Sequence, residues 1–301
     1  MKSVEFGILE FGYINPPELY AHEVINQLFQ EISLYESMGY KRLWLSEHFS
    51  PEFAWFYPEM LLPLLAGYSE KIRVGIAGIL LSYHSPLLVA QNFKILSAVY
   101  ADRIDLGIAR AGIPDNVNKY LIANEEKERL IGNWEQKITE LLFFLRNDEP
   151  KNQVLENMVV PPHGTILPEQ WILGASPSSV NLAIQHRCNL CVSFMHPGSD
   201  FKRNKDLMKT FKENFSDINN QKPITAVLLP CALVEDNDAR KKIFDESYAN
   251  STQTNLFGTK NYIQDKLALL TETFGCEEVI LYTPYWERQK RIETYKSIIE
   301  D

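Results

Sequence analysis

The sequence has few of the features that mark membrane or secreted proteins. A membrane helix needs about 18 to 20 consecutive apolar residues, but the most apolar stretch, Met60 to Gly67, is short and contains Pro63. The first residues lead directly into a strand-like pattern, without the hydrophobic core of a signal peptide. We therefore expect a cytoplasmic protein that does not contact the membrane.

An excess of positive charge is also absent. The chain carries 30 lysines and arginines against 39 aspartates and glutamates, which gives a net charge of −9. Binding to the phosphate backbone of a nucleic acid requires clustered basic side chains, and the sequence has no basic patch with interleaved aromatics. We therefore expect no nucleic-acid partner.

Cysteines and paired histidines, the usual ligands of zinc, are scarce. Of the four cysteines, Cys188 and Cys191 lie three apart around the start of a predicted strand, where such residues point to opposite faces. No second pair completes a four-ligand site, and the six histidines include no helical pair four residues apart. We expect reduced, buried thiols and no metal, which disfavours a zinc hydrolase.

What the chain does contain is a regular alternation of short apolar runs and longer amphipathic stretches. The predicted strands are Val4–Leu9, Arg42–Ser46, Arg73–Leu81, Ile104–Ala109, Gln170–Gly174, Leu190–Phe194, Ile224–Val234 and Val279–Thr283. The predicted helices are Pro17–Met38, Tyr57–Tyr68, Pro86–Val99, Asn124–Arg146, Ser178–His186, Phe201–Phe215, Asn237–Tyr248 with Lys260–Phe274, and Trp286–Ile299. The irregular segments Gly112–Ala123, Lys151–Glu169 and Asn250–Thr259 are predicted as loops.

Strands that alternate with helices imply parallel pairing through right-handed crossovers. Eight such units close a (β/α)8 TIM barrel, and the length suits one barrel domain over residues 1–301. The alternative is an open, doubly wound sheet. Such a sheet typically binds a dinucleotide through a G-x-G-x-x-G turn, and no such turn follows any of the predicted strands.

The end of the second predicted strand holds the first candidate site residue. The strand runs into Glu47 and His48, and a cluster of aromatics from Phe49 to Tyr57 follows. Active sites of barrels assemble at the carboxyl ends of the strands. His48 is therefore either a hydrogen-bonded structural residue or a group that exchanges protons near a flat apolar ligand. The aromatic cluster is either core or a subunit interface.

The ends of the fourth and fifth strands together suggest an anion site. Ser176 precedes Pro177 as a predicted hydroxyl N-cap, as Ser85 does before the third helix, so free backbone N–H groups converge at this junction. Arg110 leaves the fourth strand and offers a planar double donor to phosphate. The alternatives are simple capping by Ser176 and pairing of Arg110 with Asp105. Because both features lie on adjacent strands of one face, we favour phosphate binding.

Taken together, these motifs resemble the bacterial luciferase-like flavin-dependent monooxygenases over nearly the whole length. The resemblance lies in Arg42–Phe49, Ile72–Gly78 with Leu80–Phe93, Arg103–Gly112, Leu173–Ala183, Phe257–Thr259 and Thr294–Tyr295. It implies a TIM-like barrel, in agreement with the alternation above, and an enzyme that binds reduced FMN at the carboxyl face. Such an enzyme takes FMN from a separate flavin reductase and oxygenates a small organic substrate with O2 through a flavin 4a-hydroperoxide.

The resemblance also implies roles for individual residues. By motif match, Arg110, Ser176 and Ser179 hold the FMN phosphate, Ala77 and Gly78 form a strand-end peptide under the flavin ring, and His48 transfers a proton. Ala109 lies beside the flavin, where true luciferases carry a reactive cysteine, so light emission is not implied. We expect Phe11, Phe49, Tyr83 and His84 to line the substrate pocket.

Two other functions and an oligomeric state follow from the same resemblance. Related enzymes use the deazaflavin F420, and some small relatives only bind flavin, so an F420-dependent oxidoreductase and a non-catalytic flavin-binding protein are the alternatives. A homodimer is expected, with contacts through the predicted helices Tyr57–Tyr68 and Pro86–Val99.

Overall fold

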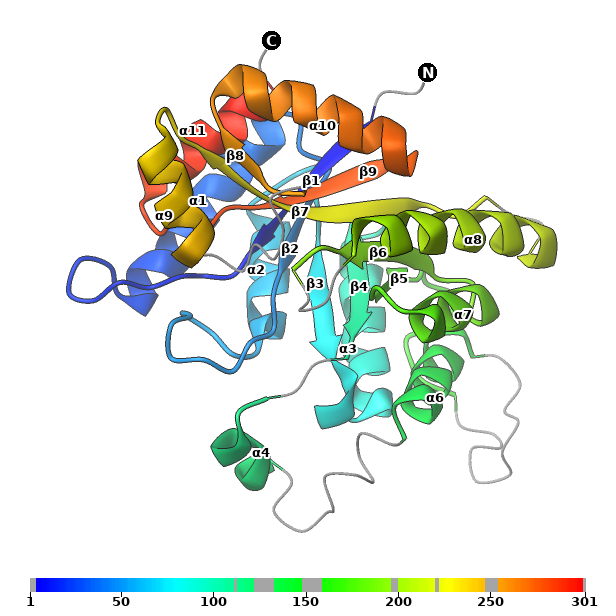
Figure 1. The fold of residues 1–301 in the computed structure, drawn as a ribbon. Coiled ribbons are helices and arrows are strands. Elements are labelled where there is room, and N and C mark those ends of the chain that lie inside the picture. The colour runs from blue at the N-terminus through cyan, green and yellow to red at the C-terminus, as the bar shows by residue number, and fades with distance from the viewer. Residues whose placement is uncertain are drawn as a thin grey trace.

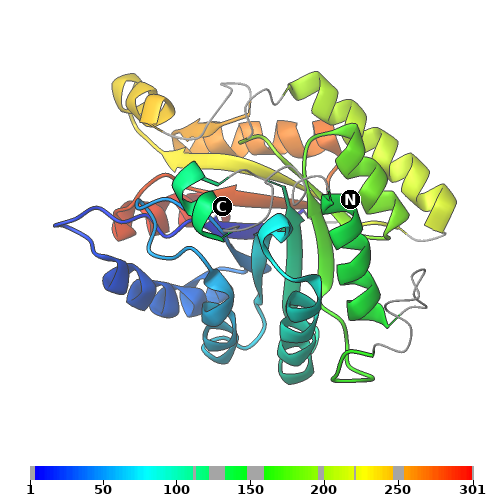
Figure 2. The same ribbon diagram turned by 90° about the horizontal axis from the view of Figure 1, so that it is seen from below.

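The computed structural model describes residues 4–110, 113–121, 133–147, 159–195, 200–219, 222–246 and 254–299. Eight parallel strands close into a barrel with helices on its outside (Figures 1 and 2). The barrel strands are β1 (Glu5–Glu10), β2 (Arg42–Leu45), β3 (Arg73–Leu80), β4 (Ile104–Ala109), β5 (Glu169–Leu173), β6 (Asn189–Ser193), β7 (Thr225–Leu233) and β9 (Glu278–Tyr282). Each strand from β1 to β7 pairs with the next, and β9 closes the ring between β7 and β1. The predicted (β/α)8 barrel is confirmed.

Helices follow the strands, and most of them pack on the outer face of the barrel, whereas the short helix Asp115–Leu121 lies beyond the carboxyl ends of the strands (Figure 1). They are α1 (Ala21–Ser37), η1 (Pro58–Leu61), α2 (Leu62–Gly67), η2 (Leu81–Tyr83), α3 (Pro86–Val99), α4 (Asp115–Leu121), α6 (Trp134–Arg146), α7 (Pro177–Gln185), α8 (Phe201–Asn219), α9 (Asn237–Glu246), α10 (Lys260–Phe274) and α11 (Arg288–Ile299). In Figure 1 the arrowheads of β3 and β4 point down toward α4, so the carboxyl face of the barrel lies on that side.

The strand predictions agree closely with the structure, since no strand end differs by more than one residue. The loop predictions are wrong in two places. Helix α4 forms within Gly112–Ala123, and strand β8 (Leu256–Gly258) forms within Asn250–Thr259 and pairs with the end of β7. Both elements are too short to produce a clear hydrophobic period. The first part of the predicted helix Asn124–Arg146 lies outside the described residues, and its last part is α6.

The two predicted hydroxyl caps have different outcomes. The Ser176 side chain accepts a hydrogen bond from the backbone N–H of Ser179 and caps α7 as predicted. Ser85 occupies the N-cap position of α3, but its side chain makes no capping hydrogen bond, so that prediction is wrong. Pro86 accounts for the helix start without it, because proline has no N–H to satisfy and its φ suits a first turn.

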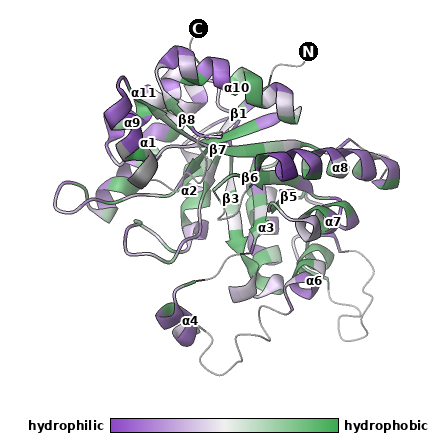
Figure 3. Cartoon of the chain, in the orientation of Figure 1, coloured by the Kyte–Doolittle hydropathy of each residue, from purple (hydrophilic) through white to green (hydrophobic). Residues whose placement is uncertain are grey.

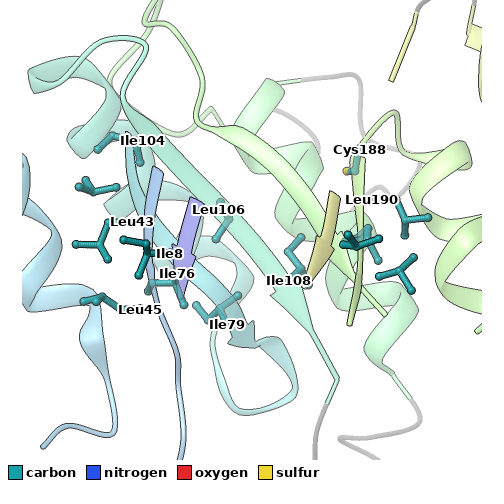
Figure 4. Packing of buried hydrophobic residues seen from close by; sticks show 14 of the residues in the cluster. Ile8, Leu43, Leu45, Ile76, Ile79, Ile104, Leu106, Ile108, Cys188 and Leu190 are labelled. Carbon is teal, nitrogen blue, oxygen red and sulfur yellow. The ribbon is translucent and has the colours of Figure 1, made fainter. Parts of the chain in front are cut away.

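The core has two layers, as expected for strands that are buried on both faces. The larger layer lies between the strands and the helices and includes Ile8, Leu43 and Ile76 (Figure 4). The smaller layer fills the barrel interior and includes Trp44 and Trp171, which meet edge to face with ring centroids 5.3 Å apart. Figure 3 shows the same division, with hydrophobic residues along the strands and hydrophilic ones on the outward sides of helices such as α8.

An ion network fills the amino-terminal end of the barrel interior. The fully buried Arg42 donates to Asp105 (2.6 Å) and to Glu278 (2.7 Å), and Trp44 Nε1 also donates to Asp105 (2.8 Å). Arg73 Nε donates to the second oxygen of Asp105 (2.7 Å). Because charges and indole rings occupy this end, open space in the barrel is left at the carboxyl end.

Candidate active site at the carboxyl end of the barrel

A cavity of about 180 Å³ lies between the carboxyl ends of strands β1 to β7. Of the residues predicted for the site, Phe11, His48, Phe49, Ala77, Gly78, Ala109 and Arg110 line this cavity. The other predicted residues, Tyr83, His84, Ser176 and Ser179, lie outside its lining. A mostly apolar wall with a few polar groups is the usual character of a site for a small molecule or a cofactor.

His48 lies three residues beyond the end of β2 and is exposed. Its ring packs against Phe11, with centroids 5.0 Å apart, and edge-on against Phe53 at 5.5 Å. The backbone N–H of Ser46 donates to the carbonyl of Glu10 and holds this strand end beside β1. The imidazole is therefore kept against one wall of the cavity by aromatic rings.

The floor of the cavity at β3 and β4 is made of small residues. The peptide bond between Ala77 and Gly78 is cis, and the pairing of β3 with β4 shifts its register between Ile76 and Ile79. A Cβ on Gly78 would lie 2.8 Å from the Cβ of Ala109, so only glycine fits there. These small residues leave a shallow apolar surface on which a flat ring can lie.

Arg110 is the exposed cation of this cavity. Its guanidinium lies over the ring of Trp134, 5.8 Å from the centroid. Within the part of the chain that the structure describes, no carboxylate lies within ion-pair distance of Arg110. Pairing with Asp105 is ruled out, because Asp105 binds Arg42 and Arg73 at the other end of the barrel. The charge of Arg110 is therefore free to meet an anion.

The turn between β5 and α7 follows the strand that pairs with β4, and Arg110 comes directly after β4. The hydroxyls of Ser176 and Ser179 are 2.9 Å apart, and a Cβ on Gly174 would lie 2.2 Å from Ser179 Oγ. Ser178 donates to Glu135 (3.3 Å) in the first turn of α6, the turn whose Trp134 carries the Arg110 contact. Arg110 and the start of α7 thus contact the same helical turn, although neither serine lines the cavity.

His84 and Tyr83 occupy the wall behind the cavity. His84 Nε2 lies 2.9 Å from Glu47 Oε1, so this ring binds a carboxylate and does not face the open space. Tyr83 packs on Phe49, Leu80 and Ile113, and its buried hydroxyl has no hydrogen-bond partner among the described residues. Both residues support the pocket wall.

Sequence reasoning missed Glu47 as a site residue. Its side chain is buried, and the residue lines the cavity next to His48. The sequence did contain an indication of this contact. Glu47 and His84 follow two adjacent strands, so both lie at the carboxyl face of the barrel, close to each other. The residues of β6 and β7 in the lining, Ser193 and Leu228, carried no distinguishing signal.

The chain belongs to the luciferase-like monooxygenase family, whose model matches residues 4–294. The protein YwcH of Bacillus subtilis is 25% identical over 303 residues, which cover 88% of this chain and 89% of YwcH. The N-acetyl-S-alkylcysteine monooxygenase of the same organism is 30% identical over 177 residues, which cover 58% of this chain and 52% of that protein. The resemblance found in the sequence motifs is confirmed.

Solved structures share the fold over the whole chain. Apo-MsnO8 superposes with a TM-score of 0.82 at 22% identity and covers 99% of this chain and 98% of its own. A second match is the oxygenating constituent of 3,6-diketocamphane monooxygenase from Pseudomonas putida, solved with FMN. Its TM-score is 0.73 at 17% identity, and the match covers 99% of this chain and 97% of that one. An F420-dependent secondary alcohol dehydrogenase also has a TM-score of 0.73, at 12% identity. This match covers 99% of this chain and 100% of that one. No helix within the described residues is long and apolar enough to cross a membrane.

Proposed function

We propose that this protein is a monooxygenase that uses O2 and FMN, reduced by a separate flavin reductase, to oxygenate a small organic substrate. Family membership supports the reaction class, and the shared fold of the FMN-bound camphane enzyme supports the choice of flavin. The observation that carries the proposal is a single cavity lined by a guanidinium that pairs with no described carboxylate, a floor of small residues and an exposed imidazole.

The residues present fit FMN. Arg110 would hold the phosphate, together with the hydroxyls of Ser176 and Ser179 at the start of α7. Ala77, Gly78 and Ala109 would lie under the ring, because a larger side chain at Gly78 would collide with Ala109. Bound there, the flavin supplies the two electrons that activate O2.

The remaining residues control water, substrate and protons. Phe11, Phe49 and Leu80 form apolar walls that exclude water and contact the organic substrate. His48 holds or releases a proton at the side of the cavity next to Phe11. We expect the substrate to be mainly apolar, because these walls offer it few hydrogen-bonding groups.

An anaerobic titration separates this function from its alternatives. Reduced FMN should bind in a 1:1 ratio, quench protein fluorescence, and be oxidised when O2 is admitted. Preferential binding of F420 with no reaction toward O2 would instead support the F420-dependent oxidoreductase. Binding of oxidised FMN without turnover of any thioether, ketone or aldehyde tested would support the flavin-binding protein, and a failure to bind either cofactor would reject all three.

We also propose a homodimer. Apolar side chains are exposed along η1, α2 and the neighbouring α3, among them Met60 (78% exposed), Leu64 (51%), Leu88 (58%) and Val99 (65%). A soluble monomer rarely exposes so many large apolar residues on adjacent helices. A second copy of the chain, seated on these helices, would cover them.

A further inference from the structure

A row of three ionisable side chains runs from the cavity wall toward the surface. Glu47, whose side chain is 1% exposed, lines the cavity. Its Oε2 accepts a hydrogen bond from the backbone N–H of Leu80 (3.0 Å), the last residue of β3. His84 Nε2 lies 2.9 and 3.0 Å from the two carboxylate oxygens of Glu47. The inner end of the row is thus buried and closely bonded.

The outer end of the row reaches solvent. His84 Nδ1 lies 3.7 Å from Glu59 Oε1, and the Glu59 side chain on η1 is 24% exposed, against 11% for His84. This separation is within ion-pair distance but longer than a hydrogen bond, so a proton can pass between the two groups only when the Glu59 side chain moves closer or a water lies between them. Exposure therefore rises in steps from Glu47 through His84 to Glu59, and the histidine presents one ring nitrogen to each carboxylate.

Neighbouring groups hold this row in place. Lys137 on α6 donates to the carbonyl oxygens of Ser82 (2.7 Å) and His84 (3.1 Å) and so fixes the backbone that carries the imidazole. The Tyr57 ring packs edge-on against His84, with centroids 5.2 Å apart. Burial, together with the charges of Glu47 and Glu59, raises the pKa of Tyr57 to about 12, so its hydroxyl stays protonated and does not compete for the proton.

We propose that Glu59, His84 and Glu47 form a proton relay that carries solvent protons into the cavity beside His48. The proposal rests on the function given above. When O2 oxidises reduced FMN in its anionic form, two electrons and one proton leave the flavin, and a second proton must come from solvent to complete hydrogen peroxide or water. Bound flavin and substrate would displace water from the apolar walls at Phe11, Phe49 and Leu80, so that proton would need a path of ionisable groups.

The proton transfer uses both nitrogens of the His84 imidazole, because one can accept a proton while the other releases one. The O–H bond of protonated Glu59 breaks as an N–H bond forms at His84 Nδ1. The Nε2–H bond of His84 then breaks as an O–H bond forms on Glu47, which presents the proton to the cavity. Burial raises the pKa of Glu59, so its protonated form persists to higher pH than that of an exposed glutamate.

The same contacts would also tie the ends of β2 and β3 together without moving any proton. Two variants separate these roles. His84→Gln keeps a donor where Nε2 stands and still bonds to Glu47, but an amide does not pass protons. Glu47→Gln keeps an acceptor for the N–H of Leu80. His22→Gln is the matched control, since His22 is exposed on α1, where its ring contacts only Tyr20 among the described residues.

The test is stopped-flow oxidation of bound reduced FMN by O2, from pH 5.5 to 9 in H2O and D2O, with FMN affinity measured in parallel. His84→Gln and Glu47→Gln should slow oxidation at least about tenfold and keep or increase its solvent isotope effect, because proton delivery then limits the rate, with FMN affinity within twofold of wild type. In the free protein, a low-field NMR signal from the His84 Nε2–H should be present and should be lost in His84→Gln. Wild-type oxidation rates and an unchanged pH profile in both variants would overturn the relay, and so would loss of FMN binding alone, which indicates a structural role. A wild-type protein that binds no reduced FMN would reject the proposed function instead.

Discussion

At the scale of single residues, the site depends on a few side chains whose partners are fixed elsewhere in the barrel. Arg110 follows β4 and pairs with no described carboxylate, and Asp105 of that strand is bound by Arg42 and Arg73 instead. His48 is held by ring contacts with Phe11 and Phe53 and remains exposed to the cavity. Ring contacts therefore position His48, and the ring of Trp134 lies under the guanidinium of Arg110.

Arg110→Ala tests the phosphate contact. If the guanidinium meets the FMN phosphate, its removal should weaken binding of reduced FMN by about 1.5–3 kcal/mol, the usual cost of losing a hydrogen bond to a charged group. Isothermal titration under anaerobic conditions measures this change. Arg203→Ala on α8 is the control, because this exposed arginine lies away from the cavity lining. Equal affinity in Arg110→Ala and wild type would reject the assignment.

At the scale of secondary-structure elements, a buried charge cluster joins β1 to two helices. Glu10 at the end of β1 lies 3.7 Å from Arg291 of α11, and Tyr35 of α1 donates to Glu31 (2.7 Å) and lies 3.3 Å from Glu10. Glu31 also binds Arg291 at 2.7 Å. Burial raises the pKa of Glu10 to about 7, and the charge of Glu31 adds to this effect, while Arg291 opposes it.

This shift makes the stability of the fold depend on pH. Between the ordinary carboxyl pKa and about 7, folded Glu10 keeps a proton that the unfolded chain has released, so the free energy of unfolding falls as pH rises through this range. Glu10→Gln, which keeps the polar contacts and has no proton to lose, should flatten this dependence. At pH 8 the variant should be more stable than wild type by about 1–3 kcal/mol.

Urea denaturation of the two proteins from pH 5 to pH 8 measures the effect. Glu18→Gln serves as the control, because Glu18 is exposed in the turn before α1. Parallel stability curves for wild type and Glu10→Gln would contradict the expected titration of Glu10.

The elements also indicate what the sequence could and could not predict. Apolar runs such as Thr225–Leu233 specify buried parallel strands, and all eight barrel strands were predicted from the sequence pattern. Strand β8 was not predicted, because three residues are too few to show a hydrophobic period. Its pairing also depends on the last residues of β7, which are distant in the sequence. Because His48 and Arg110 come directly after strands, the sequence correctly predicted that both lie at the cavity. The contact between Glu47 and His84 depends on the conformation of the loops, which hydrophobic periodicity does not determine.

At the scale of the whole molecule, the exposed apolar helices α2 and α3 determine the proposed assembly. Two charges placed on this surface, Leu64→Lys and Val99→Glu, should convert a dimer of twice 34.7 kDa into monomers, because buried unpaired charges are costly at an interface. Light scattering coupled to gel filtration measures the mass. Leu269→Lys, an exposed leucine on α10, is the control and should leave the dimer intact. A wild-type protein that runs as a monomer at all concentrations would contradict the proposal.

The whole account depends on one binding mode at the carboxyl end of the barrel. The measurement that tests it most directly is a crystal structure of the protein with FMN. The account predicts electron density for the phosphate between Arg110 and the start of α7, and for the flavin ring over Ala77 and Gly78 with His48 at its edge. Density for FMN at any other place, or a phosphate remote from Arg110, would contradict it.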